Sequence, residues 1–182
     1  MINFRGITFF ISAVLVIVSC GALSDAMITD DTLKLDRVYY SGDLRLDGYY
    51  YTRVPVNGSG DRIDIYFLYT NGIVIYGETP KIENIEGHES KFADGGYYNR
   101  INSIKYYWGV FTSNTNIIME TWEPSSGGPL KTVVRSGEIL DDKTFVITSF
   151  LNNYSGETST RNDTFYFKEF SPKPDSTNTF ID

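Results

Sequence analysis

The sequence predicts an all-β domain, most simply an antiparallel up-and-down barrel of about eight strands with a lipocalin-like calyx. Three observations favour it: stretches of period-two alternation, turn signals between them, and no crossover helices. With 14 Tyr and 12 Phe, the composition also suits pleated sheets. Consecutive antiparallel strands in that number close most simply as a barrel, which removes exposed edges. A two-sheet β-sandwich is the alternative, because periodicity does not separate the two.

The first strands lie before residue 78. Over residues 44–54 apolar and polar positions alternate, which predicts an inner face that includes Tyr50 and an exposed outer face that includes Tyr49. Gly48 within this strand indicates a bend or the close approach of another backbone. Strands are expected at 63–69 and 73–77, and the intervening Asn71-Gly72 is a hairpin signal.

The apolar–polar alternation is absent over residues 78–103, a charged stretch that predicts a partly helical insertion. Alternation then resumes, and five further strands are expected at 105–111, 116–122, 130–140, 144–150 and 164–170. The Pro-containing tail over 171–178 is expected to be extended and exposed.

The N-terminus predicts export. A short segment with Arg5 precedes the uncharged run 7–18, which has the length of a signal-peptide core and is too short for a membrane span. The following Ile17-Val18-Ser19-Cys20 resembles the lipobox of bacterial lipoproteins. The resemblance implies that Cys20 receives a diacylglycerol and becomes the mature N-terminus, attached stably to a membrane by its acyl chains.

The predicted organisation is therefore a signal peptide over 1–19, a lipidated tether over 20–37 and one barrel domain over 38–182. The lipid implies a location in the cell envelope. Gly21 follows the cysteine, with no Asp there to indicate inner-membrane retention, so the outer membrane is expected in a Gram-negative source.

Charge and residue counts exclude several functions. With 16 basic and 23 acidic residues and no basic cluster, the chain is not expected to bind nucleic acid. His88 is the single histidine and stands in a polar segment, and Cys20 is the single cysteine. Neither a catalytic triad nor a histidine–cysteine metal site is expected, so the sequence predicts no enzyme, no metal and no cofactor.

Three short motifs carry a family resemblance: Leu46-Asp47-Gly48-Tyr49-Tyr50, Tyr107-Trp108-Gly109-Val110 and the run 167–175. The chain resembles the small lipocalin-like lipoproteins of Bacteroidetes and related bacteria. This resemblance implies a calyx-like barrel whose interior holds a small apolar molecule.

The candidate ligand-binding residues are aromatic residues at alternating strand positions: Tyr50, Phe67, Tyr69, Tyr106, Trp108, Phe165 and Phe167. They either fill the core or line a cavity for a small hydrophobic or amphipathic ligand. The ligand hypothesis predicts an enclosed apolar cavity of about 300 Å³ or more. The alternative is a structural or protein-interaction lipoprotein of the cell envelope, with a filled barrel and an unknown partner.

Overall fold

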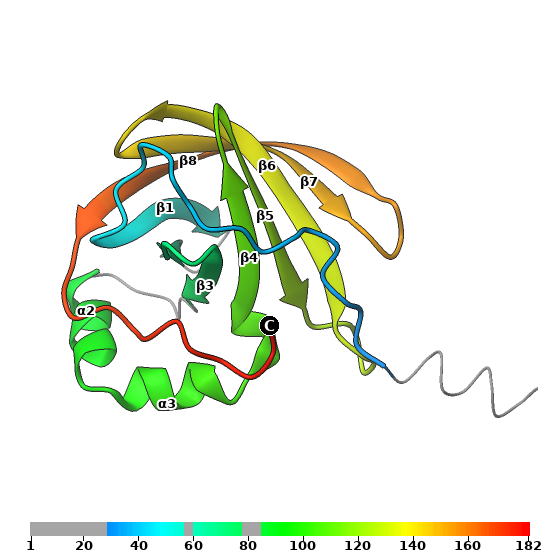
Figure 1. Cartoon of the computed structure of the whole chain (residues 1–182), viewed down its shortest axis with the longest axis horizontal. Coiled ribbons are helices and arrows are strands. Elements are labelled where there is room, and N and C mark those ends of the chain that lie inside the picture. Colours follow the sequence, from blue (N-terminus) through cyan, green and yellow to red (C-terminus); the bar gives the residue numbers. More distant parts are fainter. Residues whose placement is uncertain (1–28, 57–59, 78–84) are drawn as a thin grey trace, which may run out of the picture.

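A computed structural model of the chain describes residues 29–56, 60–77 and 85–182 (Figure 1). Its strands form one closed antiparallel barrel in chain order, and β1 pairs with β8 to close it. The strands are β1 (Gly48–Val56), β2 (Gly60–Leu68), β3 (Ile73–Gly77), β4 (Trp108–Ser113), β5 (Asn116–Glu123), β6 (Lys131–Asp141), β7 (Thr144–Asn152) and β8 (Thr158–Glu169). The predicted eight-stranded barrel is thus confirmed, and the sandwich alternative is excluded.

The segment between β3 and β4 contains the helices α2 (Glu86–Ala93) and α3 (Gly96–Asn102) and the short 3-10 turn η1 (Lys105–Tyr107). The helices lie beside the barrel wall rather than inside it (Figure 1). The partly helical insertion is confirmed over residues 85–103, and residues 78–84 lie outside the described part of the chain.

Two glycines are required by the path of the backbone. A Cβ atom on Gly48 would lie 2.0 Å from the carbonyl oxygen of Lys168, so only glycine lets β1 approach β8 at the closure of the barrel. Gly72 has a φ of 78° in the turn between β2 and β3, a conformation that favours glycine. Both features agree with the expected close approach and the expected Asn-Gly hairpin.

One end of the barrel interior is filled with aromatic rings. Tyr50 of β1 packs on Phe145 of β7 at 5.0 Å between ring centroids, and Tyr66 of β2 packs on Phe165 of β8 at 5.1 Å. These pairs join strands that are not neighbours, so the rings must point into the barrel. Buried Leu44, in the segment before β1, joins this cluster. We call this the closed end, where the β2–β3, β4–β5 and β6–β7 turns lie.

A second apolar layer lies outside the wall formed by β1 to β4. Phe67 packs on Phe92 of α2 at 5.1 Å, and the indole nitrogen of Trp108 donates to the carbonyl of Ile101 in α3 at 2.8 Å. Tyr49 is fully buried in this layer, and its hydroxyl donates to Glu89 at 2.9 Å. The expectation that Tyr49 is exposed was wrong, because the inserted helix covers this part of the wall.

The C-terminal tail also packs on the barrel. The ammonium of Lys173 donates to the carbonyls of Leu46 and Leu68 at 2.5 and 2.8 Å, and the Tyr69 hydroxyl donates to the carbonyl of Pro174 at 2.5 Å. Pro174 is buried. The tail was expected to be exposed, but these contacts across more than 100 residues of sequence hold it against the closed end.

Candidate functional site

Among the described residues, the opposite end of the barrel is lined by charged side chains and hollowed. Two adjoining hollows of about 250 and 360 Å³ share Arg62, Asp64, Glu123 and Arg135. The first hollow reaches into the barrel to Tyr66, Phe150, Arg161, Asp163 and Phe165. The second extends over the rim to Tyr76, Tyr106, Thr121 and Trp122. We call the two hollows together the charged mouth. It lies where β1, β5 and β7 end.

The strand β2 brings charge into the interior. Tyr66 faces inward, so the alternation of the strand places Asp64 and Arg62 on the same inner face. The intervening apolar residues, Ile63 and Ile65, are buried in the outer layer instead. The usual pattern of apolar inside and polar outside is therefore reversed here, because other parts of the chain cover the outer wall.

Ion pairs and hydrogen bonds hold the shared side chains in place. The Nε atom of Arg62 lies 2.8 Å from a carboxylate oxygen of Asp64, which also accepts the Tyr76 hydroxyl at 3.2 Å. Arg135 pairs with Glu123 and donates to the Thr121 hydroxyl at 2.9 Å. These contacts fix the direction of the guanidinium groups before any ligand arrives, which reduces the entropy lost on binding.

The protonation states follow from burial and neighbouring charges. Burial opposes the charge on Arg135, but Tyr66 and Glu123 beside it raise the pKa of its guanidinium on balance. Burial raises the pKa of Tyr66 to about 12, and burial with the nearby Asp64 carboxylate raises the pKa of Tyr76. At neutral pH the mouth therefore presents charged guanidinium groups beside neutral tyrosines.

One aromatic ring lies between two arginines. The guanidinium carbons of Arg135 and Arg161 lie 5.4 and 5.3 Å from the centroid of Phe150. Within the described part of the chain, neither Arg161 nor Asp163 forms an ion pair. Both line the first hollow, so it contains one cationic and one anionic group that are available to a ligand.

Among the described lining residues of the first hollow, positive and negative side chains are equal in number. The first hollow is lined by three arginines (Arg62, Arg135, Arg161) and three carboxylates (Asp64, Glu123, Asp163). Charge networks of this kind contribute little to stability and are often replaceable by apolar packing. The closed end of the same barrel is packed with aromatic and aliphatic side chains. The mouth is therefore suited to recognising a small molecule that carries charges of both signs.

The structure separates the predicted aromatic residues. Phe165 lies where the packed rings of the closed end meet the first hollow, and Tyr106 lines the second, whereas Tyr50 and Phe167 lie deeper in the closed end and line neither hollow. The other three do not line the lumen: Phe67 and Trp108 face the helices, and Tyr69 lies beneath the tail. Among the described residues, both hollows are lined by charged as well as apolar side chains, whereas an enclosed apolar cavity was expected.

The sequence reasoning missed the charged residues of the mouth. Arg135 follows Val133-Val134 in the middle of a predicted strand, and a charge in such a position is a usable signal. The Arg62-x-Asp64 spacing places both residues on one strand face. Nothing in the sequence shows that this face points inward, because that depends on the helices outside.

Fold and site together define a class: a closed eight-stranded antiparallel barrel with one packed apolar end and one charged mouth. Comparisons with family models, curated proteins and solved structures find no match to this chain. Among the described residues, no three potential metal ligands cluster, and no helix has the length and apolar character needed to cross a bilayer. Cys20 lies outside the described residues.

Proposed function

We propose that this protein is a membrane-anchored binding protein of the cell envelope, with a lipocalin-like barrel whose charged mouth holds a small amphipathic ligand. The lipobox-like sequence at Cys20 supports the anchor. Gly21 after it, in place of an Asp, supports the outer membrane if the source is Gram-negative. The observation that carries the ligand proposal is the position of Arg135, inside the barrel and beside Arg161 and Asp163, which have no ion-pair partner among the described residues.

The chemistry of the mouth supports a ligand with a zwitterionic polar group. Guanidinium groups match the geometry of carboxylates and phosphates, so Arg161 and Arg135 suit an anionic group. The carboxylate of Asp163 suits an ammonium group in the same molecule. The rings of Phe150 and Phe165 offer an apolar surface for the remainder of the ligand. The proposal assigns no catalytic step and no cofactor.

The size of the mouth limits the ligand. Of the hollows of about 250 and 360 Å³, the first is slightly smaller than typical small-molecule sites and the second lies at the lower end of their range, which begins at about 300 Å³. The packed rings of Tyr50 and Phe145 occupy the closed end beyond them. A long acyl chain would therefore extend out of the mouth rather than into the barrel.

Native mass spectrometry tests the proposal. Residues 21–182 are secreted without the lipid and purified gently from the periplasm of the source cells. We expect an additional mass that is released on denaturation as a small amphipathic molecule. Arg161→Ala and Arg135→Met should lose it, whereas Arg53→Ala, at an exposed position on β1, should retain it. A protein free of ligand that takes nothing up from an envelope lipid extract would contradict the proposal.

A second candidate is an interaction lipoprotein with a filled barrel, which the packed rings at the closed end favour. It predicts a protein partner captured by crosslinking in intact cells. That partner should remain bound to the Arg161→Ala variant, because in this case the mouth is not the site of binding.

A further inference from the structure

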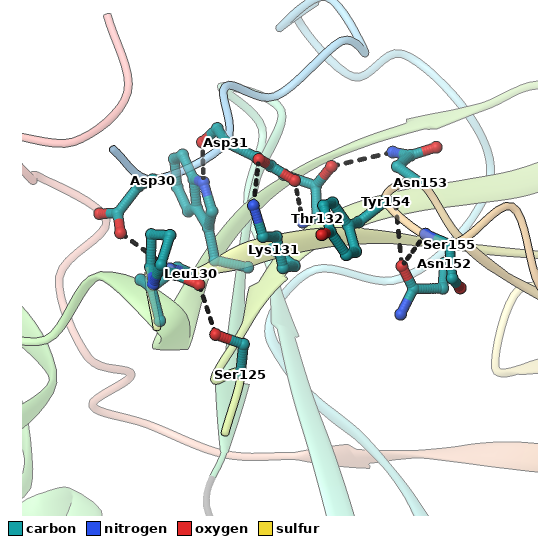
Figure 2. A network of polar contacts seen from close by, with 12 residues as sticks. Asp30, Asp31, Ser125, Leu130, Lys131, Thr132, Asn152, Asn153, Tyr154 and Ser155 are labelled. Carbon is teal, nitrogen blue, oxygen red and sulfur yellow. Dashed lines mark hydrogen bonds and ion pairs between the residues drawn. The ribbon is translucent and has the colours of Figure 1, made fainter. Parts of the chain in front are cut away.

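Residues 29–37, here called the strap, run along the outside of the barrel and begin at the mouth end. The backbone amide of Asp31 donates to the carbonyl of Leu130 at 2.9 Å, and its carbonyl accepts the indole N–H of Trp122 at 2.7 Å. Its carboxylate pairs with Lys131 at 3.1 Å (Figure 2). Leu130 precedes β6 and Trp122 stands near the end of β5, so both mark the mouth end.

A buried carboxylate fixes the middle of the strap. Glu120 of β5 is fully buried, and one of its oxygens accepts the backbone amides of Lys34 and Leu35 at 2.7 and 2.6 Å. The other oxygen accepts the side-chain amide of Asn153 at 2.8 Å. A buried carboxylate without partners is strongly destabilising, so Glu120 favours the docked strap.

The strap ends at the other end of the barrel. The Nε atom of Arg37 donates to the carbonyl of Asn71 at 2.9 Å, and the amide of Tyr40 donates to the carbonyl of Thr70 at 2.8 Å. Both acceptors lie in the β2–β3 turn at the closed end. The chain therefore enters the fold beside the charged mouth and passes along the wall to the closed end (Figure 1).

This direction brings the start of the described chain, at Thr29 and Asp30, to the mouth end, where the Asp30 carboxylate accepts the backbone amide of Leu130 at 2.8 Å. Thr29 is nine residues beyond Cys20, and nine residues span at most about 32 Å. With strands at about 3.3 Å per residue tilted by about 40°, the barrel is about 20 Å tall. Bringing the closed end to the membrane would require the tether to stretch along the whole barrel.

We infer that the docked strap holds the barrel with its charged mouth toward the membrane, where the mouth binds the zwitterionic headgroup of a phospholipid. The ligand part rests on the proposed function, and the orientation rests on lipidation of Cys20. The chain carries a net charge of −7, whereas among the described residues the three arginines of the first hollow balance its three carboxylates, so this region lacks the negative excess that would repel a phosphate group. Arg161 suits the phosphate and Asp163 the ammonium group.

Energy transfer from two labelled positions tests the orientation. The full-length lipidated protein is placed in vesicles of phosphatidylethanolamine with a minor fraction of phosphatidylglycerol and an acceptor-labelled lipid. Ser126→Cys labels the connection before β6 at the mouth, and Thr115→Cys labels the β4–β5 turn at the closed end; both positions are exposed. Because Cys20 would carry the lipid, the introduced thiol is the reactive one. We expect clearly higher transfer from position 126, and equal or reversed transfer would overturn the orientation.

Two kinds of control test the role of the strap. Glu120→Ala and, should that variant fold poorly, Asp31→Ala release the strap, so transfer from the two positions should converge. A persistent difference would overturn the role of the strap. A flexible insertion of about twenty Gly and Ser residues before Thr29 leaves the strap docked but lengthens the tether, and it should lower transfer from position 126.

The ligand class is tested separately with short-chain phosphatidylethanolamine added to the lipid-free domain. Binding that is lost in Arg161→Ala supports the headgroup assignment. No binding overturns that assignment, while a different amphipathic molecule found by native mass spectrometry would leave the proposed function standing. Failure of the orientation and failure of the mouth as a ligand site are thus distinguishable, because the energy-transfer experiment uses no added ligand.

Discussion

Replacing the pair formed by Arg135 and Glu123 separates binding from stability. Arg135→Met leaves the carboxylate of Glu123 without its cation, and breaking a fully buried pair costs about 3–5 kcal/mol. The side chain of Glu123 is 40% exposed, so water replaces part of the interaction. We expect the free energy of unfolding to fall by about 1–2 kcal/mol.

The double variant Arg135→Met with Glu123→Leu is the informative one. With both charges replaced by apolar side chains of similar size, we expect a stability within about 1 kcal/mol of the wild type, or above it. Urea unfolding followed by the fluorescence of the buried Trp108 and Trp122 measures it. Arg53→Met, at an exposed position, should change stability by less than about 0.5 kcal/mol. A double variant as unstable as the sum of its two single variants would show that the two side chains are not coupled, and it would refute the reasoning.

Three further predictions concern the fold. Phe145→Ala should cost about 3–5 kcal/mol in urea unfolding, since its ring is fully buried among aromatic neighbours, whereas Lys143→Ala in the adjacent turn should be nearly neutral. Gly48→Ala should cost about 1–3 kcal/mol of stability because the added methyl group meets the β8 backbone. Gly87→Ala in α2 should stabilise slightly, since no heavy atom lies within 4 Å of the added Cβ. Thermal unfolding of the two variants measures both effects. Burial lowers the pKa of Lys173 from 10.5 to about 8, so the unfolded state binds more protons than the folded state between these pH values. The free energy of unfolding should therefore rise with pH across this window. Urea unfolding at several pH values measures the rise, and Lys173→Met should remove it.

Local patterns were sufficient to predict the fold. Period-two alternation and the Asn71-Gly72 turn depend on residues close in sequence, and the resulting strands pair with their neighbours in chain order. Gly48 was informative for the same reason, because a glycine within a strand indicates the close approach of another backbone. The strand pairing of a meander barrel can therefore be predicted with little knowledge of contacts between distant parts of the chain.

The charged mouth could not be predicted in the same way. Whether Asp64 or Ile65 faces the interior depends on what covers the outer wall, and that cover comes from the helices between β3 and β4 and from both terminal segments. Alternation identifies two faces of a strand but not which of them is the inner one. The aromatic residues Phe67 and Trp108 were therefore assigned to the lumen, although they pack under α2 and α3.

The most direct test of the central claim is to map a bound ligand by NMR of the arginine side chains. The Nε–H signals of Arg62, Arg135 and Arg161 are followed in the lipid-free domain while an envelope lipid extract is added. The account predicts that these three signals shift, that those of Arg45 and Arg53 stay unchanged, and that Arg161→Ala abolishes the shifts. Unchanged mouth signals together with shifts of the Tyr50 and Phe145 ring signals would place the ligand in the apolar end and contradict the account.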